Sequence, residues 1–219
     1  MKNYTIKSTV IGMAMCIIGY SGFAQGFVNL DFESANITPI VTGGVFVAST
    51  NALPGWTVYD GSSQQTEMTV NDPSTGLTSV SLWATNGSQI SGNFSVILVG
   101  GFTASGATIS QTGLVPVSAD SLLFEAQAGL GGFTVTLGGQ NIPFFALATG
   151  ANYTLYGGDI SAFAGQTQQL TFSALQDFNA LNFWNLDNIQ FSSSPVPEPG
   201  ALGSSALCGL FLAWRRWKK

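Results

Sequence analysis

Turn-forming residues divide the central part of this chain into short stretches, and their spacing restricts the fold more than any other feature. Gly-Gly, Asn-Gly and Asp-Gly pairs recur about every 8–15 residues. The stretches between them are rich in β-branched and aromatic residues, which favours strands. We expect strands at residues 27–33, 56–59, 79–84, 94–99, 107–112, 121–126, 133–137, 152–156, 169–175 and 181–191. This pattern predicts an all-β fold, a β-sandwich of the jelly-roll type.

The chain divides into three parts. Residues 25–194 show no 3.6-residue apolar period, apart from one helical turn expected at 161–164. Both cysteines, Cys16 and Cys208, lie outside this stretch, so it cannot form an internal disulfide. About 170 residues are enough to bury one core. We therefore expect a signal peptide at 1–24, one β-sandwich domain at 25–194 and a sorting and anchor segment at 195–219.

The central domain has no cationic side chain. Between Lys7 and Arg215 there is no Lys, Arg or His, whereas residues 25–194 contain ten carboxylates. Nucleic-acid binding needs a basic surface and is therefore excluded. The same absence excludes histidine triads, histidine metal sites and lysine Schiff bases. Binding of carbohydrate or calcium, and hydrolysis by a carboxylate pair, are compatible with the composition.

The first 24 residues have the pattern of a secretory signal. Lys2 and Lys7 give a positive start, residues 10–20 are apolar, and Gly22 and Ala24 are the small residues expected before a cleavage point. We predict a signal helix that is removed before Gln25. An uncleaved membrane anchor is the alternative reading.

The last 25 residues combine three features in a fixed order. A proline-rich linker begins at Pro195, an apolar stretch follows at 200–214, and a basic cluster formed by Arg215, Arg216, Lys218 and Lys219 comes last. As a helix the apolar stretch would extend about 22 Å, less than the roughly 30 Å core of a bilayer. Basic residues beside an apolar segment stay in the cytoplasm. We expect a short transmembrane helix that holds the domain outside the cell until it is processed.

This ordered tail resembles the PEP-CTERM protein-sorting domain of bacteria. The motif is carried by Val196, Pro197, Glu198 and Pro199. The resemblance implies recognition by an exosortase, a membrane enzyme of the transpeptidase type, and transient anchoring in the membrane. It also implies cleavage near the motif and delivery to the cell surface or to the extracellular polysaccharide of a biofilm. Taken alone, the proline-rich tetrapeptide is also typical of an ordinary linker.

Asp187 is the candidate metal-binding residue nearest the core. With strand periodicity it shares a face with Ile189 and Phe191, which places its carboxylate at the margin of the core. A buried carboxylate needs a partner. Backbone N–H groups, protonation and a metal ion are the possibilities, and calcium is the metal that prefers oxygen ligands. Capping of a turn or exposure to solvent is the alternative reading.

The domain also resembles the galactose-binding-like jelly rolls of carbohydrate-binding modules. The resemblance is carried by residues 29–33, 53–56 and 186–191, and it supports the fold more than a ligand. It implies a structural calcium ion held by a carboxylate from the first strand and one from the last. In this sequence these residues are Glu33 and Asp187.

Six aromatic residues are candidates for stacking on sugar rings: Trp56, Tyr59, Trp83, Tyr153, Tyr156 and Trp184. The alternative is that they belong to the core of the sandwich, which we expect for Trp56 and Trp184.

We expect an exported protein without catalytic activity that binds extracellular polysaccharide or serves as matrix material. The alternative is a small polysaccharide-processing glycoside hydrolase. Such an enzyme needs two carboxylates about 5–10 Å apart, and no sequence pattern selects a pair from the ten available.

Overall fold

A computed structural model describes residues 25–38, 46–72, 79–84, 88–101, 106–129, 131–177 and 182–196. The predicted signal helix, the predicted transmembrane helix and the basic cluster lie outside these residues. Within the described part, no helix is long and apolar enough to cross a membrane.

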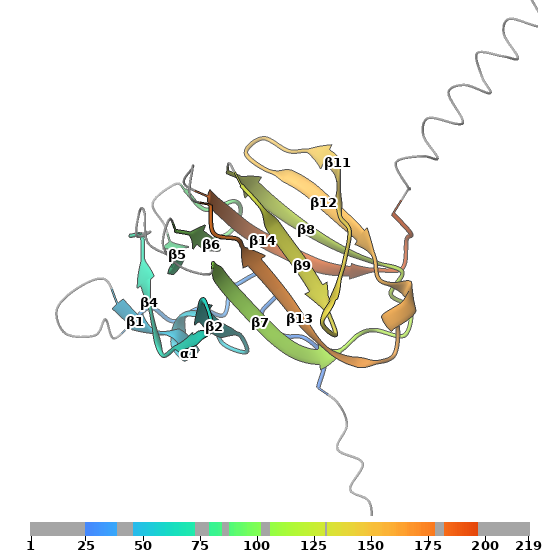
Figure 1. Ribbon diagram of the computed structural model, residues 1–219, viewed down its shortest axis with the longest axis horizontal. Coiled ribbons are helices and arrows are strands. Elements are labelled where there is room, and N and C mark those ends of the chain that lie inside the picture. The colour runs from blue at the N-terminus through green and yellow to red at the C-terminus, as the bar shows by residue number, and fades with distance from the viewer. Residues whose placement is uncertain are drawn as a thin grey trace, which may run out of the picture.

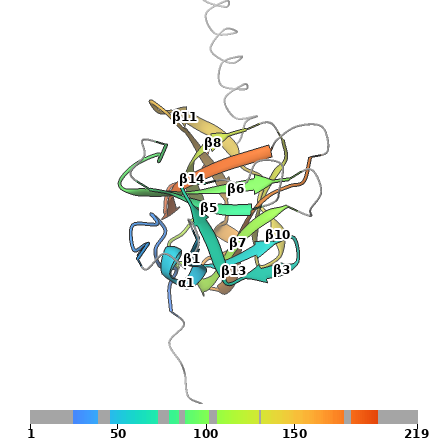
Figure 2. The same ribbon diagram turned by 90° about the vertical axis from the view of Figure 1, so that its left-hand side faces the viewer.

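The described residues form two β-sheets packed face to face, as seen in Figure 1 and end-on in Figure 2. The strands of the larger sheet are, in spatial order, β1 (Phe46–Ala48), β4 (Glu67–Val70), β5 (Ser79–Ala84), β6 (Phe94–Gly100), β14 (Asn182–Ser192), β8 (Ser121–Ala128), β12 (Thr154–Asp159) and β11 (Phe145–Thr149). Those of the smaller sheet are β10 (Gln140–Asn141), β9 (Phe133–Leu137), β13 (Thr167–Ala174), β7 (Ala107–Leu114), β2 (Thr57–Asp60) and β3 (Ser63–Gln65). The helical elements are α1 (Ser49–Ala52) and η1 (Ser161–Phe163).

The core lies between the two sheets, and aromatic contacts join them. Phe172 on β13 lies 5.4 Å from Phe124 on β8, measured between ring centroids. Phe133 on β9 stacks on Trp184 of β14 at 4.4 Å. Such contacts bury large apolar areas, which is the main stabilising term for a domain without disulfides. The all-β sandwich expected from the sequence is therefore confirmed.

Most expected strands are present. The predictions for β5 and β9 match the observed bounds, and the expected helical turn is η1. The strands that we did not predict are β1, β3, β4, β10 and β11. All five side chains of β11 are exposed, so the strand has no alternating apolar pattern that would reveal it.

The prediction of a first strand at residues 27–33 was wrong. Asn29 and Phe32 have φ values of 51° and 59°, in the left-handed region, and the chain turns there. The Asn29 side chain accepts a hydrogen bond from the Ser34 N–H at 2.9 Å, and such Asx bonds favour turns over strands. Phe32 nevertheless reaches the core.

A bulge in β14 changes which side chains face the core. From Asp187 to Gln190, β14 advances by three residues, whereas its partner β8 advances by only two, from Glu125 to Leu123. Asn188 takes up the extra residue with a φ of 45°. As a result Leu186 and Ile189 both face the core, whereas Asp187 lies on the outer face of the larger sheet. The expectation that Asp187 and Ile189 share a face was therefore wrong.

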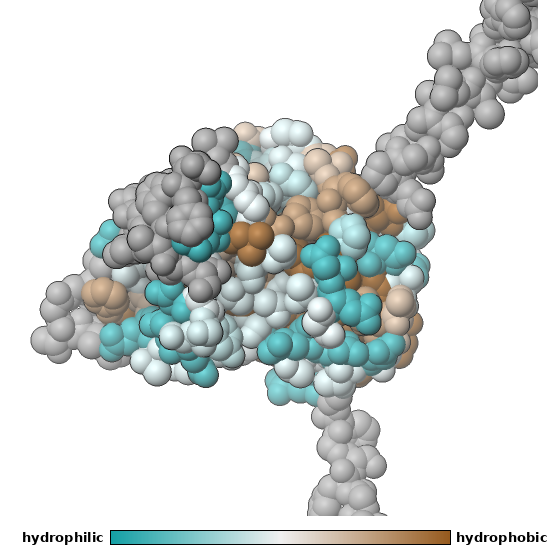
Figure 3. Space-filling model, viewed as in Figure 1, coloured by the Kyte–Doolittle hydropathy of each residue, from teal (hydrophilic) through white to brown (hydrophobic). Residues whose placement is uncertain are grey.

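The described chain ends close to the sandwich. β14 ends at Ser192, and residues 193–196 continue without regular structure. Figure 3 shows apolar surface, in brown, toward the upper right of the domain.

Candidate functional site

The strongest polar cluster surrounds Asp187 on the outer face of β14. Asp187 is 1% exposed, and its carboxylate accepts three hydrogen bonds. The donors are the Ser91 N–H at 3.0 Å, the Ser91 hydroxyl at 3.1 Å and the Asn188 N–H at 2.7 Å. The segment before β6 therefore covers the strand, and Asp187 holds it in place.

Burial raises the pKa of Asp187 from 3.8 to about 7. The hydrogen bonds from Asn188 and Ser91 oppose this shift, while the negative charge of Glu125 adds to it. No side chain of residues 25–196 is cationic, so nothing in the domain neutralises the charge. Two of the three possibilities considered from the sequence for Asp187 are present. Backbone N–H groups bind its carboxylate, and near neutral pH its carboxyl group is partly protonated.

Asn188 connects Asp187 with two further polar residues. Its side-chain amide donates to the Ser91 hydroxyl at 2.9 Å and to the Glu125 carboxylate at 3.0 Å. Glu125 in turn accepts a hydrogen bond from Tyr153, and its negative charge raises the pKa of that phenol. The left-handed backbone at the bulge thus places an amide between a hydroxyl and a carboxylate.

Glu33 binds the same covering segment at its other end. Its carboxylate accepts the N–H of Asn93 at 2.8 Å, the Asn93 side-chain amide at 2.9 Å and the Phe94 N–H at 3.0 Å. Glu33 and Asp187 therefore converge on one segment, residues 91–94, and both are satisfied by its donors. In the described part of the chain, no three His, Cys, Asp or Glu side chains form a group able to hold a metal. The calcium site remains a prediction.

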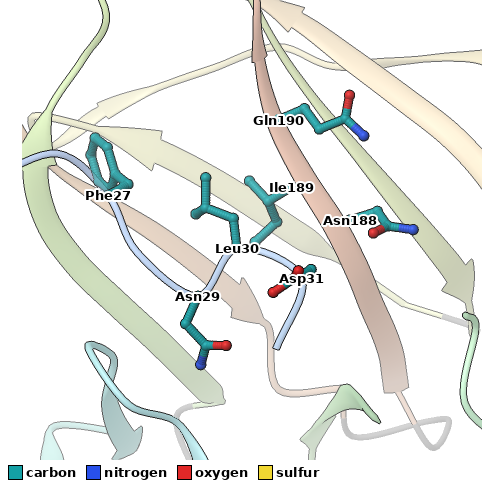
Figure 4. Close-up of a pocket in the computed structure, with 7 residues that line it drawn as sticks. All are labelled: Phe27, Asn29, Leu30, Asp31, Asn188, Ile189 and Gln190. Atoms are coloured by element: carbon teal, nitrogen blue, oxygen red, sulfur yellow. The ribbon is translucent and has the colours of Figure 1, made fainter. Parts of the chain in front are cut away.

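A groove of about 400 Å³ borders this cluster (Figure 4). One wall is the N-terminal segment with Asn29 and Asp31, and the other is β14 with Asn188 and Gln190. The two walls are joined by a hydrogen bond from the Ile189 N–H to the Leu30 carbonyl at 3.0 Å. Amide groups on both walls and the Asp31 carboxylate on one of them can donate to and accept from a polyhydroxy ligand.

The six aromatic candidates do not form one platform. Trp56 and Trp184 are 4% and 6% exposed and belong to the core, as expected. Tyr156 packs against Phe124 and Trp184 inside the sandwich. Tyr59 and Trp83 are half-buried on different sheets. Tyr153, joined to Glu125, is the candidate that contacts the polar cluster.

A second cleft, of about 160 Å³, contains two carboxylates. Asp60 from β2 and Glu67 from β4 line it, together with Gln65 and the exposed ring of Phe46. Burial raises the pKa of Asp60. The hydroxyl oxygens of Thr69 and Ser79, which also line the cleft, are buried and have no hydrogen-bond partner among the described residues. Sequence reasoning missed this pair because the two residues lie on strands of different sheets.

The structure describes only the first residue of the sorting motif, Val196. The rest of the motif lies outside the described residues: Pro197, Glu198 and Pro199. The basic cluster of Arg215, Arg216, Lys218 and Lys219 lies outside them as well. No protein-family model matches the chain, and no curated protein matches it either.

Proposed function

We propose that this chain is an exported bacterial protein, sorted through its C-terminal PEP-CTERM-like segment and displayed on the cell surface or in the extracellular matrix. The observation that carries the proposal is the position of the tail. The last strand of the sandwich ends at Ser192, and the proline-rich linker, the apolar stretch and the basic cluster follow in the sequence. An exosortase-type enzyme and, transiently, the membrane are the partners.

The sandwich fits a jelly roll in its connectivity. From β6 to β9 the chain passes between the two sheets at each step, and it passes again before β11, β13 and β14. Apart from the parallel pair β4 and β5, the neighbouring strands are antiparallel, and frequent passage between two such sheets is typical of jelly rolls. This connectivity supports the resemblance to carbohydrate-binding modules at the level of fold alone.

The proposed ligand of the domain is a polysaccharide that is neutral or carries amino groups. The groove beside β14 offers amides and a carboxylate, which suit sugar hydroxyl groups. Ten carboxylates without any cation repel uronic-acid and sulfated polymers, so acidic glycans are poor partners. Binding alone, without catalysis, is the proposed activity.

Sorting is tested in a bacterium that contains an exosortase. The full chain is followed by immunoblot in membrane and extracellular fractions, and we expect a shortened form outside the cell. A variant with Arg215, Arg216, Lys218 and Lys219 changed to Gln keeps the length and removes the charge that holds the tail in the cytoplasm. It should be processed poorly. Parental processing of this variant would contradict the proposal.

Glycan binding is tested on an array of neutral, amino-bearing and acidic polysaccharides. Gln190→Ala removes one amide of the groove and Asp31→Asn replaces its carboxylate by an amide, and each change should weaken binding about fivefold. Gln140→Ala, at an exposed position on the smaller sheet, is the matched control. Equal binding by all four proteins would exclude the groove.

A second candidate function, a polysaccharide hydrolase, is favoured by the cleft that contains Asp60 and Glu67. Retaining and inverting glycosidases need one protonated and one ionised carboxyl group. Asp60 suits the role of acid because burial raises its pKa. If the parent releases sugars from a polysaccharide, Asp60→Asn and Glu67→Gln should each reduce the rate at least about a hundredfold. Asp72→Asn, at an exposed position, should not.

A further inference from the structure

The chain beyond β14 stays attached to the sandwich. The Asp120 N–H donates to the Ser192 carbonyl at 2.8 Å. The Ser121 hydroxyl, fully buried, donates to the Ser194 carbonyl at 2.7 Å. The second bond lies past the end of the strand, so the sheet pairing alone does not explain it. The start of β8 therefore holds the segment that leads into the tail.

Val196 continues this attachment through apolar contact. A Cβ atom built on Gly157 would lie 3.0 Å from Val196 Cγ2, 2.8 Å from Leu123 Cδ2 and 2.6 Å from Leu147 Cδ1. The space that a side chain at Gly157 would fill is thus lined by Val196 and by Leu123 and Leu147, and we call this space the seat of Val196. Val196 is half-buried there. We call the Ser121–Ser194 bond and this seat the tail clasp.

Val196 is also the first residue of the sorting motif, so the clasp can affect how that motif is processed. We infer that the tail clasp holds the start of the motif against the folded sandwich and thereby limits the rate at which the sorting enzyme processes it. This inference rests on the proposed function. Enzymes that cut a chain bind it extended over several residues, so a docked residue must first leave its seat. Val196 is then a positioning residue that acts through the accessibility of Pro197–Pro199.

The first test weakens the seat. In the full chain, Val196→Ser removes the apolar contact without changing the proline-rich residues. Pulse-chase in a host with an exosortase should give processing that is roughly three- to tenfold faster than that of the parent. Val117→Ser is the matched control, because Val117 is 82% exposed and is not one of the residues that form the clasp. Processing of Val196→Ser at the parental rate, or more slowly, would overturn the inference.

The second test locks the seat. Gly157→Cys and Val196→Cys are combined in a Cys16→Ser, Cys208→Ser background, where the short distance from the Gly157 position to Val196 Cγ2 permits a disulfide. The leucine methyl groups nearby are flexible ends that can move aside. The oxidised double variant should accumulate unprocessed, while each single cysteine variant is processed. Normal processing of a cross-linked double variant would contradict the clasp as a limit on the rate.

The clasp can be separated from the sorting proposal. If the parent itself is never processed, the proposed function fails and the seat is measured directly. Purified full chain with Val196→Cys, in the same serine background, should react with a maleimide at least about threefold more slowly than chain with Val117→Cys. Unfolding in urea should equalise the two rates. Equal rates in the folded protein would overturn the seat itself.

Discussion

A single carboxyl group links the stability of this protein to pH. The pKa of Asp187 is about 7 in the folded state against 3.8 for a free side chain. Between these values the folded state keeps a proton that the unfolded state has lost. The contribution of Asp187 to stability is therefore complete below about pH 4 and is lost as the pH rises to about 7, by at most about 1.4 kcal/mol per pH unit.

We expect Asp187→Asn to flatten this dependence. Urea unfolding between pH 4 and pH 8, with a chelator present, should give a smaller decrease of the unfolding free energy for the variant than for the parent. Asp72→Asn, which changes an exposed carboxylate, should keep the parental slope. If the Asp187→Asn and parental slopes are the same, Asp187 does not titrate in this range.

Calcium binding provides a second test of the role of Asp187. A bound cation lowers the pKa of a ligating carboxylate. If Glu33 and Asp187 hold calcium as predicted, added calcium should raise the melting temperature of the parent and flatten its pH dependence, and chelator should reverse both changes. An unchanged melting temperature would exclude the calcium site.

Asn188 has a role in both the backbone and the side-chain structure. Asn188→Ala removes two side-chain hydrogen bonds and places alanine at a φ of 45°. Asn188→Gly removes the same bonds but adopts this conformation freely. We expect Asn188→Ala to be the less stable variant by about 1–2 kcal/mol, measured by urea unfolding. Equal stabilities would mean that the left-handed backbone at residue 188 costs alanine no more free energy than glycine.

At the scale of elements, the strand ends tolerate little added volume. A Cβ atom at Gly100, the last residue of β6, would collide with the Leu175 carbonyl. Because a backbone atom cannot move aside as a side chain can, Gly100→Ala should destabilise the protein by about 1–3 kcal/mol. Gly26→Ala is the control, since no atom lies within 4 Å of its Cβ position. A similar melting temperature for both variants would contradict this packing.

The elements also show where sequence reasoning succeeds. β5 and β9 were predicted with the observed bounds because glycines and polar turns enclose apolar, alternating residues. β11 was missed because its side chains are all exposed. The segment 27–33 has strand-like residues, but the side chains of Asn29 and Asp31 accept hydrogen bonds from backbone N–H groups nearby and turn the chain, and this local competition is not visible in periodicity.

At the scale of the whole molecule, Phe172 is one of the aromatic residues that join the two sheets. Phe172 contacts Trp56, Phe124 and Phe133 and is fully buried. Phe172→Ala should lower the unfolding free energy by about 3–5 kcal/mol. Val117→Ala, at an exposed position, should change it little. A loss below about 1 kcal/mol would mean that the core collapses around the smaller side chain.

The candidate site could be predicted only in part. Glu33 and Asp187 were selected as a pair of calcium ligands, which stays a prediction, and in the structure each binds the segment 91–94. Their partners, Ser91 and Asn93, were not foreseen, since they come from a segment about a hundred residues before Asp187 that no local pattern connects to it. The pair Asp60 and Glu67 likewise depends on how the two sheets meet, which a one-dimensional pattern does not specify.

β14 is the last strand in chain order, yet it lies between β6 and β8 in the middle of the larger sheet. A polypeptide that crosses a membrane from its N-terminus delivers this strand after every other one. Until then β6 and β8 have no partner on one side, and open strand edges invite pairing with other chains. If the chain is exported as we propose, its translocation should therefore depend on chaperones that shield the unfinished sheet.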